Sequence, residues 1–406
     1  MTHSTAPVRT TTDFSRRNFF RMAAGASALA TMPLLSEMEM ARAQMPRFTD
    51  PDKGIHIDAN ENPLGPSAAA RQAIEEIIPR SGRYLFPYKD KFTDLFAETV
   101  NVKPENVVAF AGSTQALHFA ILAHTSKERG LVMADPGYEP PMWAAKFNGA
   151  PIFQVPLADP RGKASHDVRA MLKATATPGV IYLCNPNNPT GTATSRAEIE
   201  YAVENAPKDT LVLIDEAYIH FSDEQPSLDF VRAGRNVIVL RTFSKLYGMA
   251  GLRLGCAIGR EDLVKQLVPY GADNPLPVTA VAAGRASLLE KDLVATRKKI
   301  NAETREAAFA WLRDAGYNCT PSVSNCFLLD VKRPGREVIA ALAQKNVFVG
   351  RLWPSWPTWV RITVGTPEEM QIFRKAFSEV MSRTTAHFGE PPVKAWRREF
   401  PYARLS

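Results

Sequence analysis

The sequence lacks the features that mark several specialised classes of protein. Its 406 residues include only four cysteines and no Cys-x-x-Cys pair, so neither a zinc site nor a thioredoxin-like redox site is indicated. The net charge of +7 comes from residues scattered along the chain, and no basic stripe with interleaved aromatic residues points to a nucleic acid. No internal repeat or low-complexity tract stands out. What remains is an ordinary globular composition, 45% hydrophobic and 22% charged, long enough for one large and one smaller domain.

The four cysteines fall into two kinds of surroundings. Cys184 and Cys256 lie inside apolar runs, where a cysteine usually behaves as a small core hydrophobe. Cys319 and Cys326 are close in sequence, and a disulfide between them is conceivable in an oxidising compartment. The sequence leaves that pairing open.

The N-terminus contains the three parts of an export signal in order. Paired arginines, Arg16 and Arg17, precede a weakly apolar stretch at residues 22–35, and Ala41-Arg42-Ala43 supplies an A-x-A cleavage site. The apolar stretch is too short and too rich in alanine to span a membrane. The segment resembles a bacterial twin-arginine signal peptide. That resemblance implies export of the folded protein by the twin-arginine machinery, cleavage near Ala43, and a periplasmic mature protein without a stable membrane anchor.

Short apolar runs followed by polar residues recur through the middle of the chain. The runs lie at residues 107–110, 131–134, 180–184, 211–214, 237–240 and 254–258. Helical or loop segments separate them, which predicts an α/β fold whose mostly parallel sheet is covered by helices on both faces. The polar residues that follow the runs would meet at the edge where open α/β sheets bind ligands.

The rest of the chain predicts a smaller α+β domain and peripheral segments. A long amphipathic helix is expected at residues 291–315, strands at 327–331 and 360–364, and helices at 336–345 and 367–382. An N-terminal arm would pack on this domain or on a partner subunit. We therefore divide the chain into a signal peptide (1–43), an arm (44–80), a large domain (81–288), a small domain (289–385) and a tail (386–406).

Two charged residues near the ends of apolar runs indicate chemistry. Lys245 follows the run at 237–240, and a lysine whose ammonium is disfavoured by burial can react with carbonyl groups. Asp215 directly follows the run at 211–214, where a carboxylate is costly unless it is paired, although it could also cap a helix. The stretch Gly112-Ser113-Thr114 opens a helix after a strand, a position suited to N-capping and to binding a phosphate dianion.

Six segments, taken in order, resemble the class I/II aminotransferases of fold type I that use pyridoxal phosphate (PLP), and among them the histidinol-phosphate aminotransferase group. The similarity extends over about residues 55–382. The segments are Asp58-Ala59-Asn60-Glu61-Asn62-Pro63, Arg83-Tyr84, Asn187-Asn188-Pro189-Thr190-Gly191, Asp215-Glu216-Ala217-Tyr218, Ser244-Lys245 with Gly251-Leu252-Arg253, and Arg361-Ile362-Thr363-Val364-Gly365-Thr366.

The resemblance implies PLP as the cofactor and a role for each matching residue around its ring. Lys245 would form the Schiff base with the cofactor aldehyde and move a proton from the substrate Cα. Asp215 would pair with the protonated pyridine nitrogen, which keeps the ring electron-accepting. Asn188 and Tyr218 would hydrogen-bond the phenolic oxygen. Tyr138 would stack on the ring, although an ordinary core tyrosine is an alternative there.

The resemblance also implies sites for the two anions. The cofactor phosphate would be held by hydroxyls, helix-terminal amides and one arginine, namely Ser113, Thr114, Thr242, Ser244 and Arg253. Tyr84 would reach the phosphate of the neighbouring subunit, which implies a homodimer. Arg361 would clamp the substrate carboxylate, with Arg351 as a second anion-binding arginine and Asn60 in the same site. Residues 350–357 are rich in Trp and Pro, so they could form an aromatic wall that favours apolar substrates over a phosphate ester, or simply pack.

Three functions compete at this point. The first is a periplasmic PLP-dependent aminotransferase that moves an amino group between an amino acid and a 2-oxo acid or a related carbonyl, such as a histidinol-phosphate-like substrate. The second is a PLP-dependent oxidase, lyase or decarboxylase, because residues that bind the cofactor do not decide which bond breaks. The third is a non-enzymatic binding protein, against which the presence of both Lys245 and Asp215 argues.

Overall fold

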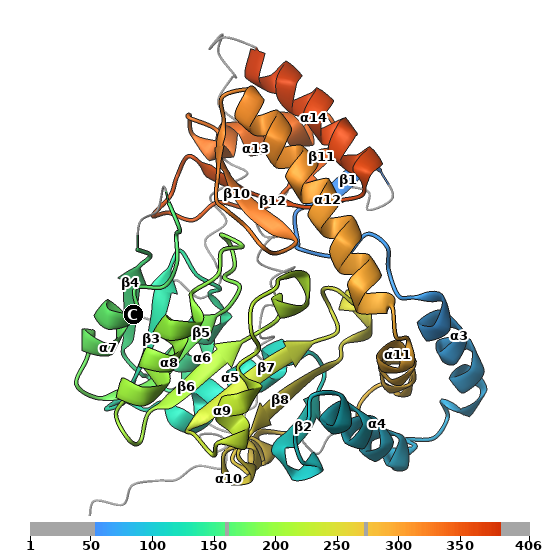
Figure 1. Cartoon of the computed structure of the whole chain (residues 1–406), viewed down its shortest axis with the longest axis vertical. Helices are drawn as coiled ribbons and strands as arrows, with labels where there is room; N and C mark the ends of the chain where they lie inside the picture. The colour runs from blue at the N-terminus through green and yellow to red at the C-terminus, as the bar shows by residue number, and fades with distance from the viewer. Residues whose placement is uncertain (1–52, 159–161, 272–274, 383–406) are drawn as a thin grey trace, which may run out of the picture. The chain divides into compact units, whose positions relative to one another are not determined.

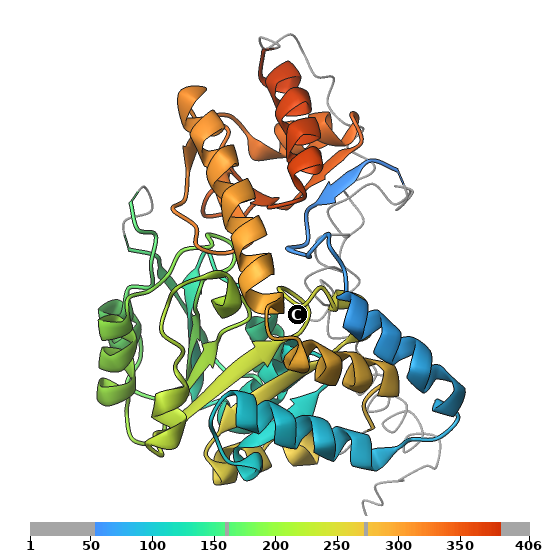
Figure 2. The same cartoon turned by 45° about the vertical axis from the view of Figure 1, so that its right-hand side comes forward.

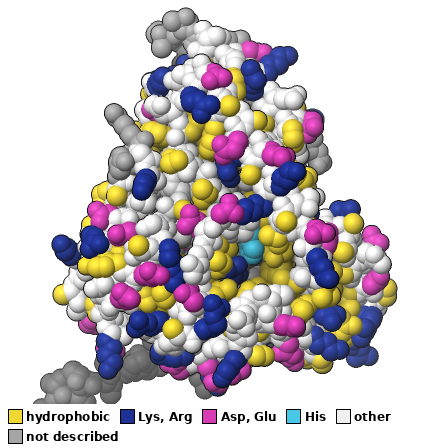
Figure 3. All heavy atoms as spheres, in the orientation of Figure 1, with side chains coloured by type: hydrophobic (Ala, Val, Ile, Leu, Met, Phe, Trp, Pro, Cys, Tyr) yellow, Lys and Arg dark blue, Asp and Glu magenta, His cyan; other side chains and the backbone are white. Residues whose placement is uncertain are grey.

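The computed structural model describes residues 53–158, 162–271 and 275–382. The predicted signal peptide at residues 1–43 and the tail at residues 386–406 lie outside the described residues. Within the described ranges, no helix has the length and apolar character needed to cross a membrane. On the face drawn in Figure 3, basic and acidic side chains are intermixed, without a broad area of one sign.

A seven-stranded sheet in the order β2-β8-β7-β6-β5-β3-β4 forms the large domain (Figure 1). Only β8 runs antiparallel to its neighbours, so the prediction of a mostly parallel α/β sheet is confirmed. The strands are β2 (Val107–Phe110), β3 (Gly130–Asp135), β4 (Ile152–Pro156), β5 (Pro178–Cys184), β6 (Leu211–Asp215), β7 (Val237–Thr242) and β8 (Gly255–Gly259). Each of the six apolar runs falls on a strand. The strand without a predicted run, β4, lies at the sheet edge and is only partly buried.

Helices cover both faces of this sheet because successive strand residues point to opposite sides. On β6, Val212 and Ile214 pack into one apolar cluster, and Leu211 and Leu213 pack into another. The first cluster is covered by α4 (Phe86–Thr99), α7 (Val168–Lys173), α8 (Arg196–Asn205), α9 (Leu228–Arg232) and α11 (Val278–Leu289). The second is covered by α5 (Ser113–His124), α6 (Pro140–Phe147) and α10 (Glu261–Lys265).

The C-terminal part has its own core and two small sheets. The helix α12 (Leu293–Asp314) leads into a three-stranded antiparallel sheet, in the order β12-β10-β9, and a two-stranded parallel pair, β1-β11. These elements pack around Phe327, Phe373 and Phe377. Their bounds are β1 (Ile55–Ile57), β9 (Asn318–Cys319), β10 (Cys326–Asp330), α13 (Gly335–Ala343), β11 (Val347–Val349), β12 (Trp359–Thr363) and α14 (Pro367–Ser382).

The N-terminal arm is divided between the two parts of the chain. Its strand β1 pairs with β11 of the C-terminal part, whereas α3 (Ala68–Ile77) packs on α11, as Figure 2 also shows. The α3 helix begins after Ser67, whose hydroxyl accepts a hydrogen bond from the Ala70 amide at 3.2 Å and so caps the helix. The short 3₁₀ helices are η1 (Ile78–Arg80), η2 (Pro104–Asn106), η3 (Ile219–Phe221), η4 (Ala250–Leu252) and η5 (Val268–Tyr270).

The four cysteines all lie within the described residues, and no disulfide joins them. Cys319 faces Leu329 across the β9–β10 pair, while Cys326 at the other end of β10 faces Thr363 on β12. The two thiols therefore occupy different register positions and do not form the disulfide that the sequence left open. Cys184 and Cys256 are buried in the sheet as predicted.

Candidate active site

Asp215 and Lys245 follow neighbouring parallel strands. Asp215 is the last residue of β6, and Lys245 lies just beyond β7, which ends at Thr242. The Asp215 carboxylate is 3% exposed and accepts hydrogen bonds from the Tyr182 hydroxyl at 2.9 Å and the Ala217 amide at 3.1 Å. The two residues therefore meet at the carboxyl edge of the sheet, where α/β folds bind their ligands.

The surroundings of Asp215 favour a cationic ligand. Burial raises the pKa of its carboxyl from 3.8 to about 6, although the Tyr182 hydroxyl, the Ala217 amide and the Lys245 ammonium all act in the opposite direction. A buried carboxylate is costly unless a cation joins it. A protonated ring nitrogen placed against Asp215 would offset that cost.

The Tyr218 hydroxyl joins four segments that are distant in sequence. It accepts hydrogen bonds from Nδ2 of Asn60 at 3.1 Å and Nδ2 of Asn188 at 3.3 Å. The side-chain oxygen Oδ1 of Asn188 in turn accepts a hydrogen bond from Nη1 of Arg361 at 3.0 Å. The Nζ atom of Lys245 lies 5.5 Å from the centre of the Tyr218 ring and donates to the Ala59 carbonyl at 3.2 Å. The structure thus brings Asn60, Asn188, Tyr218, Lys245 and Arg361 together.

A second group of predicted residues surrounds the first turn of α5. Nη1 of Arg253 donates to Oγ of Ser244 at 3.1 Å, and the Ser244 amide donates to Oγ1 of Thr242 at 3.1 Å. Gly112 precedes α5 with φ 86°, and a Cβ atom added there would overlap the Arg253 guanidinium. The first amides of α5, at Ser113 and Thr114, have no carbonyl within the helix to bind, so this end of the helix attracts an anion.

The side chain of Tyr138 borders this second group. It is 8% exposed, and its hydroxyl lies 3.3 Å from Oγ1 of Thr114. Tyr138 follows β3, so it too lies at the carboxyl edge of the sheet. Its position fits a ring that packs on the face of a ligand held between the two groups.

Two predicted residues have different surroundings. Tyr84 precedes α4 and is 70% exposed, next to the exposed ring of Phe86, so it is not among the residues gathered in this chain's site. Arg351 is buried and forms an ion pair with Glu139, the residue after Tyr138. Its guanidinium also lies 4.2 Å from the centre of the Trp353 ring.

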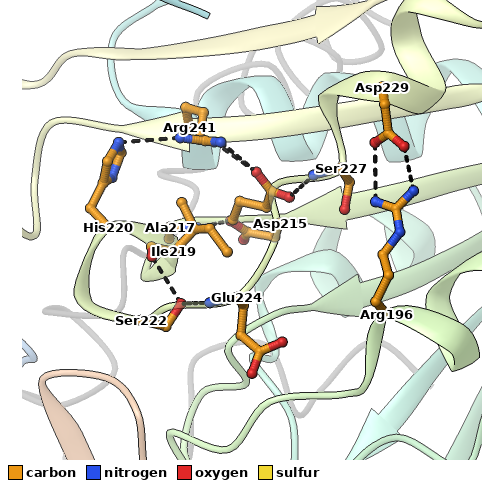
Figure 4. A network of polar contacts seen from close by, with 11 residues as sticks. Arg196, Asp215, Ala217, Ile219, His220, Ser222, Glu224, Ser227, Asp229 and Arg241 are labelled. Carbon is orange, nitrogen blue, oxygen red and sulfur yellow. Dashed lines mark hydrogen bonds and ion pairs between the residues drawn. The ribbon is translucent and has the colours of Figure 1, made fainter.

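The sequence reasoning missed a polar network that begins at the residue after Asp215 and includes Arg241 and His220 (Figure 4). Glu216 accepts a hydrogen bond from Nε of Arg241 at 2.8 Å and from the Ser227 amide at 2.6 Å. Nη1 of Arg241 lies 3.2 Å from Nε2 of His220. Because a guanidinium only donates, His220 accepts on Nε2, and both burial and Arg241 lower its pKa to about 3. An arginine within an apolar strand was the available signal, since such a charge requires a partner.

The two groups match the three polar parts of pyridoxal phosphate. Lys245 provides an amine for its aldehyde, Asp215 a carboxylate for its ring nitrogen, and the α5 terminus with Ser244 and Arg253 a cradle for its phosphate. The Arg253 guanidinium can take its position beside the α5 terminus only because residue 112 lacks a side chain. The residues present therefore fit the cofactor.

Comparison with known proteins agrees with this fit. Residues 52–377 match the family model for aminotransferases of class I and II. The histidinol-phosphate aminotransferase of Moorella thermoacetica is 33% identical over 337 residues, which cover 81% of this chain and 86% of that protein. The enzyme of the same name from Symbiobacterium thermophilum is 35% identical over 336 residues, 80% of this chain and 90% of that protein.

The fold is also shared with a solved structure. The histidinol-phosphate aminotransferase of Sinorhizobium meliloti in complex with pyridoxal-5'-phosphate superimposes with a TM-score of 0.76 at 23% identity. The match covers 86% of this chain and 97% of that one. The prediction of PLP fold type I is confirmed.

Proposed function

Because the chain belongs to the class I and II aminotransferase family, we propose that it moves an amino group from an amino acid to a 2-oxo acid or a related carbonyl compound. It is a PLP-dependent aminotransferase, and the family does not favour oxidation, elimination or decarboxylation as the outcome. The observation that carries the residue assignments is the meeting of Asp215, Lys245 and the Arg253 cradle at one edge of the sheet.

Bound pyridoxal phosphate supplies an aldehyde that links to amines and a cationic ring that accepts electrons from a bond at the substrate Cα. Lys245 would hold the cofactor through Nζ, and the same atom would carry a proton away from the substrate Cα. Asp215 would keep the proton on the ring nitrogen by pairing with it. Asn188 and Tyr218, whose side chains are hydrogen-bonded to each other, would orient the ring through its phenolic oxygen.

Arg361 binds the substrate carboxylate. It is fully buried, it contacts Asn188, and it lies on β12 of the C-terminal part, whereas Lys245 follows β7 of the large sheet. A guanidinium fork matches the geometry of a planar carboxylate. Asn60 supports this arrangement, since its amide donates to Oγ1 of Thr363 at 2.9 Å and its side chain reaches Tyr218.

A homodimer would complete the site. Large apolar side chains are exposed around α3, α4 and α11, namely Ile78 at 54%, Tyr84 at 70%, Phe86 at 58% and Leu289 at 58%. Exposed apolar residues that gather in this way favour burial against another chain. In such a dimer Tyr84 would extend to the phosphate cradle of the other subunit.

We further propose that the enzyme works in the periplasm after export by the twin-arginine route. The support is the order of arginine pair, apolar stretch and A-x-A motif in residues 15–43. Replacing Arg16 and Arg17 with lysine should retain the protein in the cytoplasmic fraction with residues 1–43 still attached. Periplasmic recovery of the doubly substituted protein would contradict export by this route.

The reaction itself is tested by stoichiometry. The purified mature protein, loaded with PLP, should convert an amino donor and a 2-oxo acid into equal amounts of the new amino acid and new 2-oxo acid. Release of ammonia or peroxide in place of the new amino acid would contradict transfer. The relatives are named for histidinol phosphate, so that compound belongs in the donor panel beside ordinary amino acids.

A further inference from the structure

We infer that the substrate site accepts one anionic group, the α-carboxylate, and disfavours a second, so that the amino acid it takes has an uncharged side chain. The inference rests on the aminotransferase function proposed above and adds the substrate class. Glu139 is the residue that determines this specificity.

Each cationic side chain around the site can be assigned either to the cofactor or to the substrate. Lys245 serves the cofactor aldehyde, and Arg253, bonded to Ser244 beside the α5 terminus, serves its phosphate. Five arginines are buried among the described residues. Arg241 pairs with Glu216, Arg305 pairs with Glu306, and Arg297 donates to the Leu246 and Gly65 carbonyls. We assign the other two, Arg361 and Arg351, to the substrate. They are neighbours, because the Arg361 amide donates to the Arg351 carbonyl at 3.2 Å.

The two arginines are also joined by one indole. The centre of the Trp353 ring lies 4.2 Å from the Arg351 guanidinium carbon and 5.7 Å from that of Arg361. Both distances are within the range of a cation–π interaction. Trp353 is 2% exposed, so an apolar ring separates the clamp at Arg361 from the second cation.

The charge of Arg351 is already balanced by Glu139. The side chains of the pair are 5% and 24% exposed, and Nη2 of Arg351 is in hydrogen-bond contact with Oε2 of Glu139. Since Glu139 follows Tyr138, this carboxylate lies beside the residue expected to stack on the cofactor ring. The pair adds no net positive charge to the site.

Two further contacts hold the pair in place. The indole Nε1 of Trp353 donates to the Gly137 carbonyl at 2.9 Å, and Oγ of Ser355 donates to Oδ1 of Asp135 at 3.1 Å. The stretch 351–355 is therefore fixed to the stretch 135–139 at three points. Releasing Arg351 towards a ligand would break the ion pair and leave Glu139 partly buried without its partner, which is unfavourable.

These contacts decide which side chains the site tolerates. A substrate α-carboxylate finds the Arg361 fork and is neutralised by it. A second anion, whether a side-chain carboxylate or a phosphate ester, finds a neutral pair whose negative member repels it. An uncharged side chain meets no such penalty, and the Trp353 ring adds apolar surface near the clamp. The preferred substrate thus differs from the phosphate ester for which the relatives are named.

Binding of unreactive anions to the PLP-loaded protein tests this directly. Calorimetric titration should give a Kd for 3-phenylpropionate, which carries one charge, at least about tenfold lower than for glutarate or phenyl phosphate. In Glu139→Gln, both dianions should bind at least about tenfold more tightly than to the unaltered protein, with phenylpropionate little changed. Equal affinities in the unaltered protein, or no gain for the dianions in Glu139→Gln, would overturn the inference.

Two further variants separate charge from side effects. Glu200→Gln removes a carboxylate that also pairs with an arginine, Arg196, but on α8, and should leave all three affinities unchanged. The double variant Glu139→Gln/Arg351→Gln removes both charges of the pair, so it should regain the preference for the monoanion. This variant also keeps the test available if Glu139→Gln alone fails to fold. A double variant that prefers dianions would contradict the role assigned to charge.

Reaction with donors distinguishes failure of this inference from failure of the proposed function. If no amino acid changes the visible absorption of the PLP-loaded protein, the aminotransferase assignment fails. If glutamate or histidinol phosphate reacts with a higher kcat/KM than phenylalanine and leucine, the assignment stands and the inference fails. The reverse order of kcat/KM supports both.

Discussion

The guanidinium of Arg241 on β7 is paired with the carboxylate of Glu216, the residue directly after Asp215, at which β6 ends. The side chains are 6% and 1% exposed, and the Ser227 amide satisfies the second oxygen of Glu216. Arg241 also reaches His220, so it contacts residues on both sides of Tyr218 in the sequence. This one side chain therefore ties the segment that carries Asp215 and Tyr218 to the strand that leads to Lys245.

Breaking the Arg241–Glu216 pair should destabilise the protein strongly. Arg241→Met leaves a buried carboxylate without its partner, for which a loss of about 3–5 kcal/mol of unfolding free energy is expected. Arg241→Met/Glu216→Leu removes both charges and should recover a substantial part of that loss. Urea unfolding at a fixed protein concentration measures both. A double variant as unstable as Arg241→Met would show that the unpaired charge is not the cause.

The stability of the cofactor-free protein should carry a signature of Asp215. Its folded pKa of about 6 lies above the ordinary 3.8, so the folded state binds more protons than the unfolded state between these values. The contribution of Asp215 to stability is then most favourable below pH 4 and is lost as the pH rises through 6, a cost of about 3 kcal/mol. Asp215→Asn abolishes this titration, so its stability relative to the unaltered protein should rise by that amount from pH 4 to pH 7. A difference that stays constant with pH would contradict the burial argument.

The cradle for the cofactor phosphate depends on the absence of a side chain at residue 112. Gly112→Ala would force its Cβ into the Arg253 guanidinium and would strain a backbone at φ 86°. Strain of this kind amounts to about 1–3 kcal/mol, so the Kd for PLP should rise roughly tenfold or more. Gly82→Ala, where an added Cβ meets nothing within 4 Å, is the matched control. Unchanged PLP affinity in Gly112→Ala would place the phosphate elsewhere.

The exposed apolar residues around α3 and α4 should form the dimer interface. Phe86→Glu places a charge at this surface and should shift the protein to monomers in sedimentation. PLP should also bind more weakly, because the proposed contribution of the partner subunit's Tyr84 to the cradle would be lost. Phe147→Glu on α6, an equally exposed phenylalanine, serves as the control and should remain dimeric. Dimers that survive Phe86→Glu, or a monomer in the Phe147→Glu control, would place the interface elsewhere.

How much of this structure the sequence predicts depends on how far apart in the chain the interacting residues lie. Continuous apolar runs predicted strands such as β6 and β7 because both faces of a central strand are buried. The edge strand β4 gave no such signal, since Phe153 and Gln154 are not buried. The order of the motifs located Asp215 and Lys245 because the carboxyl ends of parallel strands meet at one edge.

The hydrogen-bond and ion-pair partners of the site residues come from distant segments, and the sequence patterns did not predict them. Tyr182 lies inside an apolar strand, and only the alignment of β5 with β6 brings its hydroxyl to Asp215. The ion pair of Arg351 with Glu139 joins residues 212 positions apart. The predicted anion-binding role for Arg351 depended on its being available to a ligand, and only the folded structure reveals the carboxylate that neutralises it.

Replacement of Lys245 tests the central claim most directly. The mature protein loaded with PLP should absorb in the visible and lose that band on addition of an amino donor, while Lys245→Ala should lack the band and transfer amino groups at least about 10³-fold more slowly. Lys127→Ala, which alters an exposed lysine, should behave as the unaltered protein does. Retention of both the band and the transfer rate in Lys245→Ala would contradict the account.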